Sequence, residues 1–329
     1  MRPSGALTRS PRGRFAPSPT GPLHLGNART ALISWLAARA AGGAYVMRVE
    51  DLDGPRVRPG LEGRILDELR WLGIDWDEGP DVGGPSAPYR QSERAPAYAA
   101  ALARLRALDL VYPCFCSRAE IAAVAQAPHG PSDEGPRYPG TCARLDAAEA
   151  ARRTAARRPA WRFHAAPGKV RFHDGLHGAQ EVDVAAQVGD FVVARADGVP
   201  AYQLAVVVDD AAMAVTDVVR GDDLLPSTGR QLLLYAALGL PPPRFAHVPL
   251  VVGDDGERLA KRHGALSLGE LRERGADPLA VVGLLAELSG LASAGARLAA
   301  ADLVAGFSLD LLPRGPAVLA AGRAGALAA

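Results

Sequence analysis

Two short segments near opposite ends of the chain carry side chains that suit anion binding. The first segment, containing His24, Gly26 and Asn27, lies between an expected strand and an expected helix. In an open α/β sheet, such a junction presents free backbone N–H groups and a helix N-terminus to a phosphate. His24 and Asn27 add side-chain donors, and Gly26 lets another group approach the backbone closely. Taken alone, this histidine is more simply explained as a surface loop residue.

The second segment, residues 258–262, reads Arg-Leu-Ala-Lys-Arg. It contains Lys261, one of two lysines among 37 basic residues. A lysine kept against such a strong use of arginine suggests a position that needs a compact ammonium and not a planar guanidinium. A solvated basic loop would explain this segment alone. Its combination with the His24 loop in one α/β domain favours a shared phosphate site.

Three cysteines, Cys114, Cys116 and Cys142, lie close together in the chain. Their odd number in a long chain argues against a disulfide framework. A structural zinc site needs four tetrahedral ligands, and Tyr138 and His129 are the nearest candidates for the fourth. Three buried thiols without a metal are the alternative.

The elements that would position these residues begin with a strand at 14–16, a helix at 26–41 and a strand at 45–49. This order is the opening of a parallel, doubly wound sheet. A capping box, Ser117 to Glu120, opens a short helix in the cysteine region. Hydrophobic periodicity and capping residues predict further helices at 61–72, 95–108, 145–158 and 226–238, one that starts at 277–278, and a helical final forty residues. Strands are expected at 161–164, 188–195, 201–208 and 247–252.

Composition sets the limits on these predictions. A chain of 329 residues suggests two domains, or one domain with a large insertion. Hydrophobic residues make up 48% and charged residues 22%, as in globular proteins. The net charge of +1 gives no global field for nucleic acid, so RNA contacts would need a local basic patch. No apolar run is long enough for a membrane span, and no secretory signal is visible, so a reduced, cytoplasmic protein is expected.

These segments together resemble a known family. Residues 22–27 (Pro-Leu-His-Leu-Gly-Asn) resemble the "HIGH" signature of class I aminoacyl-tRNA synthetases, and residues 258–262 resemble their "KMSKS" loop. In the second motif, Arg258 and Leu259 take the first two positions, and Ala260 replaces the usual serine, which removes a hydroxyl donor. Five further segments look like parts of glutamyl-tRNA synthetases: 14–21, 47–53, 89–94, 202–205 and 217–223. The similarity runs from about residue 14 to about residue 289.

The resemblance implies an α/β fold with a Rossmann-like parallel sheet, an inserted zinc-binding subdomain, a C-terminal helical region and no anticodon-binding domain. The expected divisions are an N-terminal extension (1–13), the two halves of the catalytic domain (14–110 and 188–257), the inserted subdomain (111–187) and the KMSKS-like loop with the C-terminal region (258–329). Only 67 residues follow Arg262, too few for a second RNA-binding domain.

The resemblance also implies activation of L-glutamate with ATP and Mg²⁺, in which negative charge builds on phosphate oxygens. The implied catalytic residues are His24, Asn27 and Lys261. The implied ATP-binding residues are Pro17, His24, Gly26, Asn27 and Lys261. The implied glutamate-binding residues are Arg14, Phe15, Ala16, Pro17, Ser18, Glu50, Tyr202 and Arg220.

These residue types suit a small zwitterionic diacid. The two arginines suit its carboxylates, Glu50 suits its ammonium, and Tyr202 and Ser18 add neutral hydrogen bonds. Ordinary ion pairs are the alternative explanation for two of these side chains. The pairs would be Arg220 with Asp222 or Asp223, and Glu50 with Arg48 or Arg56.

Within the family, Cys-x-Cys followed by Tyr-x-x-x-Cys resembles the zinc site of the glutamyl-queuosine tRNA(Asp) synthetases. This resemblance implies one structural Zn²⁺ held by Cys114, Cys116, Tyr138 and Cys142. The implied partners are L-glutamate, ATP and tRNA(Asp) bearing queuosine, with no membrane and a monomeric state. The alternatives are a shortened glutamyl-tRNA synthetase that charges a 3′ end and a non-catalytic RNA- or nucleotide-binding protein. The tRNA-gripping surface would be arginine-rich, with candidates Arg137, Arg144, Arg152, Arg153, Arg157 and Arg158.

Overall fold

The structure is a computed structural model that describes residues 10–117, 119–121, 137–257, 259 and 267–328. The α-helices are α1 (Leu25–Ala40), α2 (Leu61–Trp71), α3 (Ala95–Ala107), α5 (Ala147–Ala156), α6 (Val184–Gln187), α7 (Tyr202–Ala212), α8 (Leu225–Leu238), α9 (Leu268–Glu273) and α10 (Pro278–Glu287). The strands are β1 (Arg12–Phe15), β2 (Ala44–Met47), β3 (Val111–Cys114), β4 (Ala160–Phe163), β5 (Val170–Asp174), β6 (Gly178–Val182), β7 (Phe191–Ala194), β8 (Asp217–Gly221), β9 (Arg244–Val248), β10 (Val251–Val252) and β11 (Ala317–Val318).

Parallel strands form the centre of the fold. β1 pairs in parallel with β2, and β8 pairs in parallel with β9. The end of β5 joins β9 in parallel, and β6 follows as an antiparallel edge strand. The two halves meet where the backbone N–H of Thr216, just before β8, donates to the carbonyl of Arg12. The resulting order β2–β1–β8–β9–β5 is that of a doubly wound α/β fold, whose ligands bind at the carboxyl ends of the strands.

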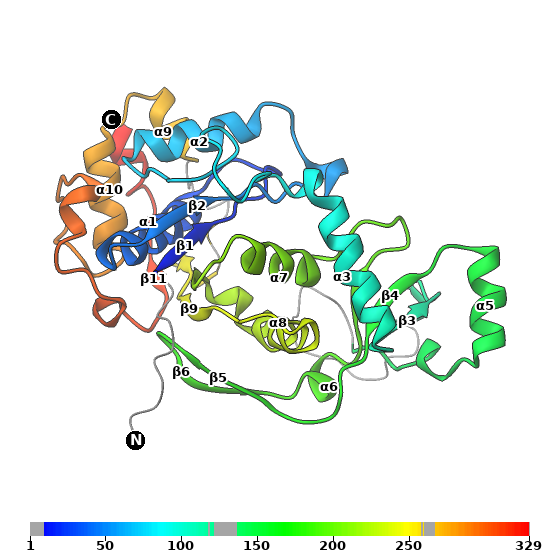
Figure 1. The fold of residues 1–329 in the computed structure, drawn as a ribbon. Helices are drawn as coiled ribbons and strands as arrows, with labels where there is room; N and C mark the ends of the chain where they lie inside the picture. The colour runs from blue at the N-terminus through cyan, green and yellow to red at the C-terminus, as the bar shows by residue number, and fades with distance from the viewer. Residues whose placement is uncertain (1–9, 118, 122–136, 258, 260–266, 329) are drawn as a thin grey trace, which may run out of the picture.

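Helix α1 lies inside the molecule and sets the position of the His24 loop. Leu25, Leu32, Ile33 and Leu36 on this helix are fully buried. A helix that is apolar on nearly all sides must be covered on all sides, and α1 packs against β1, β8 and α10 (Figure 1). Its N-terminus therefore lies at the carboxyl end of β1, where the candidate phosphate loop is.

A second sheet is antiparallel and carries the cysteine region. β4 pairs with β3 on one side and with β7 on the other. In Figure 1 this sheet and α5 lie at the side of the molecule away from α1 and α10. The aromatic side chains Phe163 and Phe191 pack between neighbouring strands, with ring centroids 5.3 Å apart. Cys114 thus lies on a separate sheet from the strand that precedes the predicted phosphate loop, with Cys116 just after it and Cys142 in a 3₁₀ turn.

Most expected elements are confirmed with small shifts of their ends. The first strand, helix and second strand occupy 12–15, 25–40 and 44–47. Asp277 caps α10 by accepting from the N–H groups two and three residues on, as predicted. The reciprocal bonds of the capping box between Ser117 and Glu120 are also present.

Two predictions are wrong. The segment 201–208, expected to be a strand, forms helix α7. Its apolar, β-branched run fits a buried strand or a buried helix equally well, so the pattern could not separate them, and every residue from Gln203 to Asp210 is buried in the helix that forms. The final forty residues are not one helix: up to residue 328 they form 3₁₀ turns, loops and strand β11.

The antiparallel hairpin of β5 and β6 is an element that sequence patterns did not predict. Its strands are short and charged, so hydrophobic alternation is weak. The segment expected as one strand at 247–252 is also divided, into β9 and β10, at Pro249. Within the described residues no helix is both long and apolar enough to cross a membrane.

Candidate functional site

The candidate phosphate loop leads directly into α1. His24 is the N-cap residue, with extended backbone, and its carbonyl accepts the N–H of Ala28 at 3.0 Å. The first turn of α1 contains no acidic residue, so the positive end of the helix dipole is not neutralised there. A Cβ atom added at Gly26 would come no closer than 3.8 Å to the protein, at Val251, so this side of the helix start is uncrowded. The geometry suits an anion at the helix N-terminus.

The fold brings the ends of the second basic segment to the same place. Leu259 donates its N–H to the carbonyl of Val251 at 3.3 Å, next to Gly26. Ser267 forms a β-bridge with His24, and the N–H of Leu268 donates to the carbonyl of Leu23 at 2.9 Å. Lys261, with Arg258, Ala260 and Arg262, lies outside the described residues, as does His129.

A buried network of charges surrounds the candidate amino-acid site. Arg48 is fully buried and lies 2.6 Å from Asp210, 3.1 Å from Glu50 and 3.8 Å from Asp209. Asp209 also accepts from Gln91, Arg94 and Tyr98, at 2.6–2.8 Å. A buried charge is tolerated only when it is paired and hydrogen-bonded, and here each partner restrains the next.

This network holds Arg14 and Glu50 in place. The Nη1 atom of Arg14 donates to the carbonyl of Val219 at 3.2 Å, and its Nε lies 3.7 Å from Asp210. Glu50 pairs with Arg48, so the ion pair considered from sequence is present; the other considered partner, Arg56, pairs with Asp53 instead. Burial raises the pKa of Glu50, and the charges of Arg48 and Arg14 oppose that rise.

Arg220 differs from the other buried arginines around this site. It is 4% exposed, and among the described residues it forms no ion pair with Asp222 or Asp223, the pairs considered from sequence. Within this part of the chain its hydrogen bonds go to uncharged acceptors: His247, Thr228 and the carbonyl of Leu224. The Nη1 atom has no partner among the described residues. Burial accordingly lowers the pKa of Arg220. A guanidinium that is buried, charged and incompletely hydrogen-bonded suits a carboxylate ligand.

The predicted amino-acid residues lie near one another. The charges of Arg220, Glu50 and Arg14 all act on the phenol of Tyr202, whose pKa is raised mainly by burial. Pro17 accepts the N–H of Glu50 at 3.0 Å, so the loop from Phe15 through Ala16 to Ser18 is joined to the end of β2. Strands β1 and β8, the segment after β2 and the start of α7 thus bring two cations, one carboxylate and one phenol near one another.

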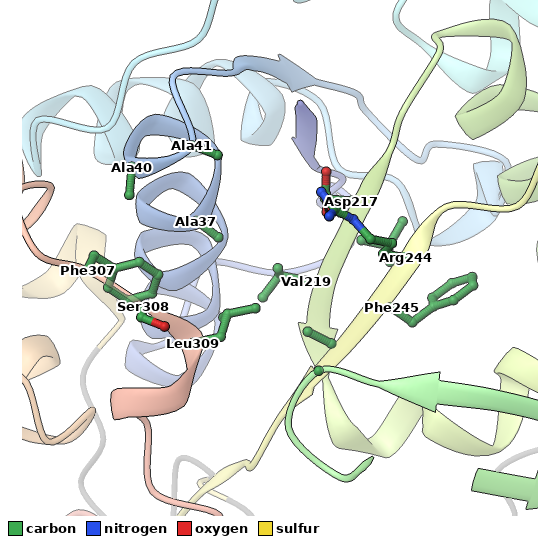
Figure 2. A pocket seen from close by; sticks show the side chains of 13 residues that line it. Ala37, Ala40, Ala41, Asp217, Val219, Arg244, Phe245, Phe307, Ser308 and Leu309 are labelled. Atoms are coloured by element: carbon green, nitrogen blue, oxygen red, sulfur yellow. Dashed lines mark hydrogen bonds and ion pairs between the residues drawn. The ribbon is translucent and has the colours of Figure 1, made fainter. Parts of the chain in front are cut away.

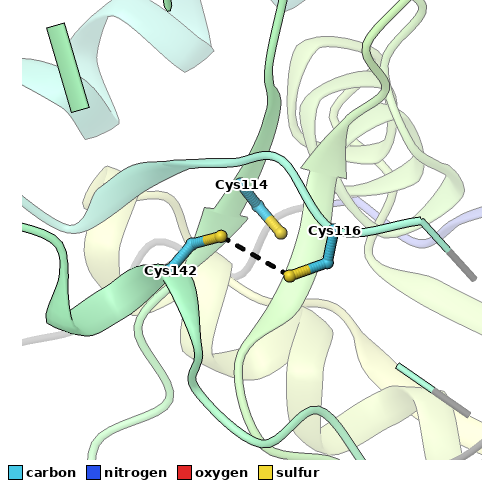
Figure 3. Close-up of side chains that lie close together, drawn as sticks. All are labelled: Cys114, Cys116 and Cys142. Atoms are coloured by element: carbon cyan, nitrogen blue, oxygen red, sulfur yellow. Dashed lines mark hydrogen bonds between the residues drawn. The ribbon is translucent and has the colours of Figure 1, made fainter. Parts of the chain in front are cut away.

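The cysteines form the second candidate site, shown in Figure 3. The sulfur atoms of Cys114, Cys116 and Cys142 lie within 4.8 Å of one another, close enough to hold a metal ion. The hydroxyl of Tyr138 lies 3.5 Å from the Cys114 sulfur and 3.7 Å from the Cys116 sulfur. The guanidinium of Arg162 stacks on the Tyr138 ring and donates to the Cys114 sulfur at 3.3 Å. Three sulfurs and one phenol oxygen converge, which matches the donor number that zinc prefers.

A cavity of about 400 Å³ lies elsewhere, at the other end of the sheet (Figure 2). Its lining includes the C-terminal part of α1, the first residues of β8 and β9, and Phe307 to Leu309. Asp217 and Arg244 at its edge pair with each other at 2.7 Å. The cavity is therefore separate from the convergent polar groups at the carboxyl ends of the strands.

Comparison with known proteins places this geometry in a family. Residues 11–302 match the family described as tRNA synthetases class I (E and Q), catalytic domain, and the chain belongs to it. The chain is 56% identical to a Glutamyl-Q tRNA(Asp) synthetase from Symbiobacterium thermophilum, over 92% of this chain and 94% of the relative. It is 51% identical to one from Nitratidesulfovibrio vulgaris, over 93% and 95%. A crystal structure of a glutamate tRNA ligase from Elizabethkingia meningosepticum superimposes with a TM-score of 0.84, at 31% identity, over 97% of this chain and 69% of that one.

The structure also shows residues that the sequence did not single out. They are Asp209 and Asp210, which pair with Arg48 in the buried network, and Asp174 and His247 behind Arg220. Two adjacent aspartates inside an apolar run were a visible signal for Asp209 and Asp210, since buried carboxylates need partners. His247 and Asp174 gave no such signal.

Proposed function

We propose that this chain activates L-glutamate with ATP and transfers the glutamyl group to queuosine in the anticodon loop of tRNA(Asp). The observation that carries the amino-acid part is Arg220, a buried guanidinium that has no carboxylate partner within the described residues, beside Arg14, Glu50 and Tyr202. A diacid with one ammonium group would satisfy both arginines and Glu50. Glutamine would leave the second guanidinium facing a neutral amide, and such a mismatch at a buried polar site is strongly disfavoured.

The proposed roles at the reacting end follow from the loop geometry. His24, Asn27 and the start of α1 would hold the phosphates of ATP, with Pro17 and Gly26 shaping the loop. Lys261 would neutralise charge that develops on the transferred phosphate, and Mg²⁺ would come with the nucleotide. The α-carboxylate of glutamate attacks the α-phosphorus of ATP, and pyrophosphate leaves. The hydroxyl of the acceptor then attacks the acyl carbon of the adenylate, so that an ester forms, AMP leaves and the hydroxyl proton is released.

We propose one structural zinc ion held by Cys114, Cys116, Cys142 and Tyr138. When bound, the ion would cross-link β3 to the turn that follows residue 137, and it would take no part in the chemistry. The fit rests on the convergence of the phenol oxygen and three sulfurs. We also propose a reduced, cytoplasmic location, with which three free cysteines agree. We further propose that the chain acts as a monomer.

The queuosine acceptor is supported by the relatives. The chain aligns with 94–95% of two proteins named Glutamyl-Q tRNA(Asp) synthetase, but with 69% of the solved glutamate tRNA ligase. The second candidate function, charging of a tRNA 3′ end, is favoured by the 0.84 TM-score with that ligase. In both cases the first step is the same, so the acceptor nucleotide separates them.

The test uses radiolabelled glutamate, ATP and tRNA(Asp) with or without queuosine. We expect label that depends on queuosine and that nuclease digestion recovers in the anticodon-loop fragment and not with the 3′-terminal nucleotide. Label on unmodified tRNA(Glu) that is recovered with the 3′-terminal nucleotide would support the second candidate. Glutamate-dependent exchange of pyrophosphate into ATP, measured with and without tRNA, checks the activation step. If no exchange occurs in either case, the chain is a non-catalytic binding protein.

A further inference from the structure

The acceptor of the Arg220 Nε–H group is a neutral imidazole where a carboxylate would be usual. Nε of Arg220 donates to Nε2 of His247 at 3.0 Å. Nη2 of Arg220 donates to the hydroxyl of Thr228 at 2.9 Å, and this hydroxyl lies 3.3 Å from the same Nε2 atom. Arg220 and Thr228 therefore both depend on a lone pair at His247 Nε2.

Asp174, the last residue of β5, determines which nitrogen of His247 carries the proton. Its Oδ2 atom lies 2.5 Å from Nδ1 of His247, and both side chains are completely buried. Its Oδ1 atom accepts the backbone N–H groups of Leu176, His177 and His247, at 3.0–3.2 Å. An ionised carboxylate only accepts hydrogen bonds, so Nδ1 must donate and Nε2 is left as an acceptor.

The charge states agree with this hydrogen-bond pattern. Burial, reinforced by the charge of Arg220, lowers the pKa of His247 to about 4 despite the bond to Asp174. Burial tends to raise the pKa of Asp174, but bonds from His247 and from two backbone N–H groups lower it to about 2. At neutral pH the imidazole is uncharged, so it orients Arg220 without neutralising it.

We propose that His247, with its tautomer set by Asp174, is a positioning residue that aims Arg220 at the side-chain carboxylate of the amino acid and favours glutamate over glutamine. The proposal rests on the proposed function, in which Arg220 binds that carboxylate. A carboxylate in place of His247 would orient Arg220 equally well but would cancel its charge, and the site would lose its preference for an anion.

Asp174→Asn tests the proposal with little change in shape. The Asn Oδ1 atom can keep the three bonds to backbone N–H groups, while its amide nitrogen replaces Oδ2 and donates to Nδ1 of His247. The imidazole proton then moves to Nε2, where it faces the Nε–H of Arg220. Two donors cannot form a hydrogen bond, so the contact that orients Arg220 is lost. The matched control is the same substitution at another aspartate, Asp183→Asn. Asp183 caps α6 by accepting a hydrogen bond from the N–H of Ala186.

Two measurements separate positioning from a purely structural role. In pyrophosphate exchange, we expect Asp174→Asn to raise KM for glutamate at least about tenfold, with KM for ATP unchanged and the glutamate-to-glutamine ratio of kcat/KM reduced. In ¹⁵N NMR of histidine-labelled protein, we expect the Nδ1–H tautomer of His247 in the wild type and the Nε2–H tautomer in Asp174→Asn. His247→Gln, whose amide oxygen can accept from Arg220, should keep more glutamate selectivity than His247→Leu.

The outcomes also distinguish this proposal from the proposed function. If wild-type protein shows no glutamate-dependent exchange, the proposed function fails, whereas the tautomer measurement still reports on His247. If exchange is normal and Asp174→Asn matches Asp183→Asn in KM for glutamate and in selectivity, the positioning role is wrong. An Nε2–H or a doubly protonated His247 in the wild type at neutral pH would also overturn it.

Discussion

At the scale of single residues, two buried arginines near the same site have different partners. Arg14 lies 3.7 Å from Asp210 and donates to a carbonyl, whereas the acceptors of Arg220 in the described part of the chain are all neutral. Of these two arginines, Arg220 therefore keeps more of its positive charge unneutralised. A buried charge without a counter-ion is costly. A substrate carboxylate that pairs with Arg220 would therefore supply favourable electrostatic free energy that Arg220 does not obtain from the described residues.

Arg220→Lys is expected to impair glutamate use although it conserves charge. The ammonium cannot reproduce the planar fork that contacts His247, Thr228 and a carboxylate together, so KM for glutamate should rise by at least about tenfold. The measurement is pyrophosphate exchange over a glutamate series at saturating ATP. Arg244→Lys, at the other end of the same sheet, is the control; an equal effect there would contradict the assigned role.

The buried His247–Asp174 pair predicts acid sensitivity of the fold. An unfolded histidine binds a proton below about pH 6.5, whereas folded His247 binds one only near pH 4. Stability should therefore fall as pH drops from 6.5 towards 4, by at most about 3 kcal/mol from this group. Asp174, with its pKa lowered to about 2, loses its contribution only between about pH 3.8 and 2.

Urea unfolding at several pH values measures this slope. His247→Gln removes the titrating group, so its free energy of unfolding should depend less on pH between 6.5 and 4 than that of the wild type. Parallel slopes for the two proteins would show that other groups cause the acid sensitivity.

At the scale of elements, the cysteine region depends on contacts between strands and turns. β3 contributes Cys114, and the turn around Cys142 contributes another sulfur and a backbone N–H that donates to the Tyr138 hydroxyl at 2.9 Å. This region has a small hydrophobic cluster of its own, which includes Tyr112 and Phe115. A small cluster contributes limited stability, so a metal cross-link should stabilise these elements substantially.

Cys116→Ala is expected to lose the zinc and to lower the melting temperature of the protein. Tyr138→Phe should weaken zinc binding at least about tenfold in competition with a chelator, since it removes the proposed fourth donor. Tyr112→Phe is the matched control, because its hydroxyl bonds to Asp190 and not to a cysteine. Zinc content is measured by mass spectrometry; unchanged affinity in Tyr138→Phe would exclude the phenol as a ligand.

At the scale of the whole molecule, charge is balanced overall but locally uneven. The net charge is +1, yet six exposed arginines lie in and near α5, a helix that Figure 1 shows on the side of the molecule away from α1 and α10. Arg152 and Arg153 both pair with Glu149, whereas Arg144 and Arg158 form no ion pair within the described part of the chain. Local positive surface of this kind suits phosphates of RNA.

Binding of tRNA(Asp) should weaken with salt, and Arg144→Ala and Arg158→Ala should each reduce the dependence of log K on log salt concentration by about one. Arg171→Ala is the control, since Arg171 is exposed on β5 and pairs with Glu181. Filter binding at a series of salt concentrations gives the slopes. Equal slopes for all three variants and the wild type would place the RNA surface elsewhere.

The sequence alone determined the local elements and the motif residues. The strand, loop and helix around His24 could be predicted because proline, glycine and hydrophobic spacing act over a few residues. The fold class, family and convergence of the three cysteines followed from motifs and their order, and the family match confirms the first two. Where local patterns were ambiguous, as in the apolar run of α7, prediction was wrong because burial on all sides is a property of the packed molecule.

Only the tertiary structure decided which charges are paired. Asp174 and His247 are 73 residues apart, and they meet because the end of β5, one strand of the hairpin that was not predicted, pairs in parallel with β9. Arg48 and Asp210 are separated by 162 residues and meet across the sheet. Residue types show that Arg220 can bind a carboxylate, but whether a described carboxylate pairs with it depends on which side chains the strands bring beside it. Coulomb energies depend on distance and burial, and the packed fold determines both.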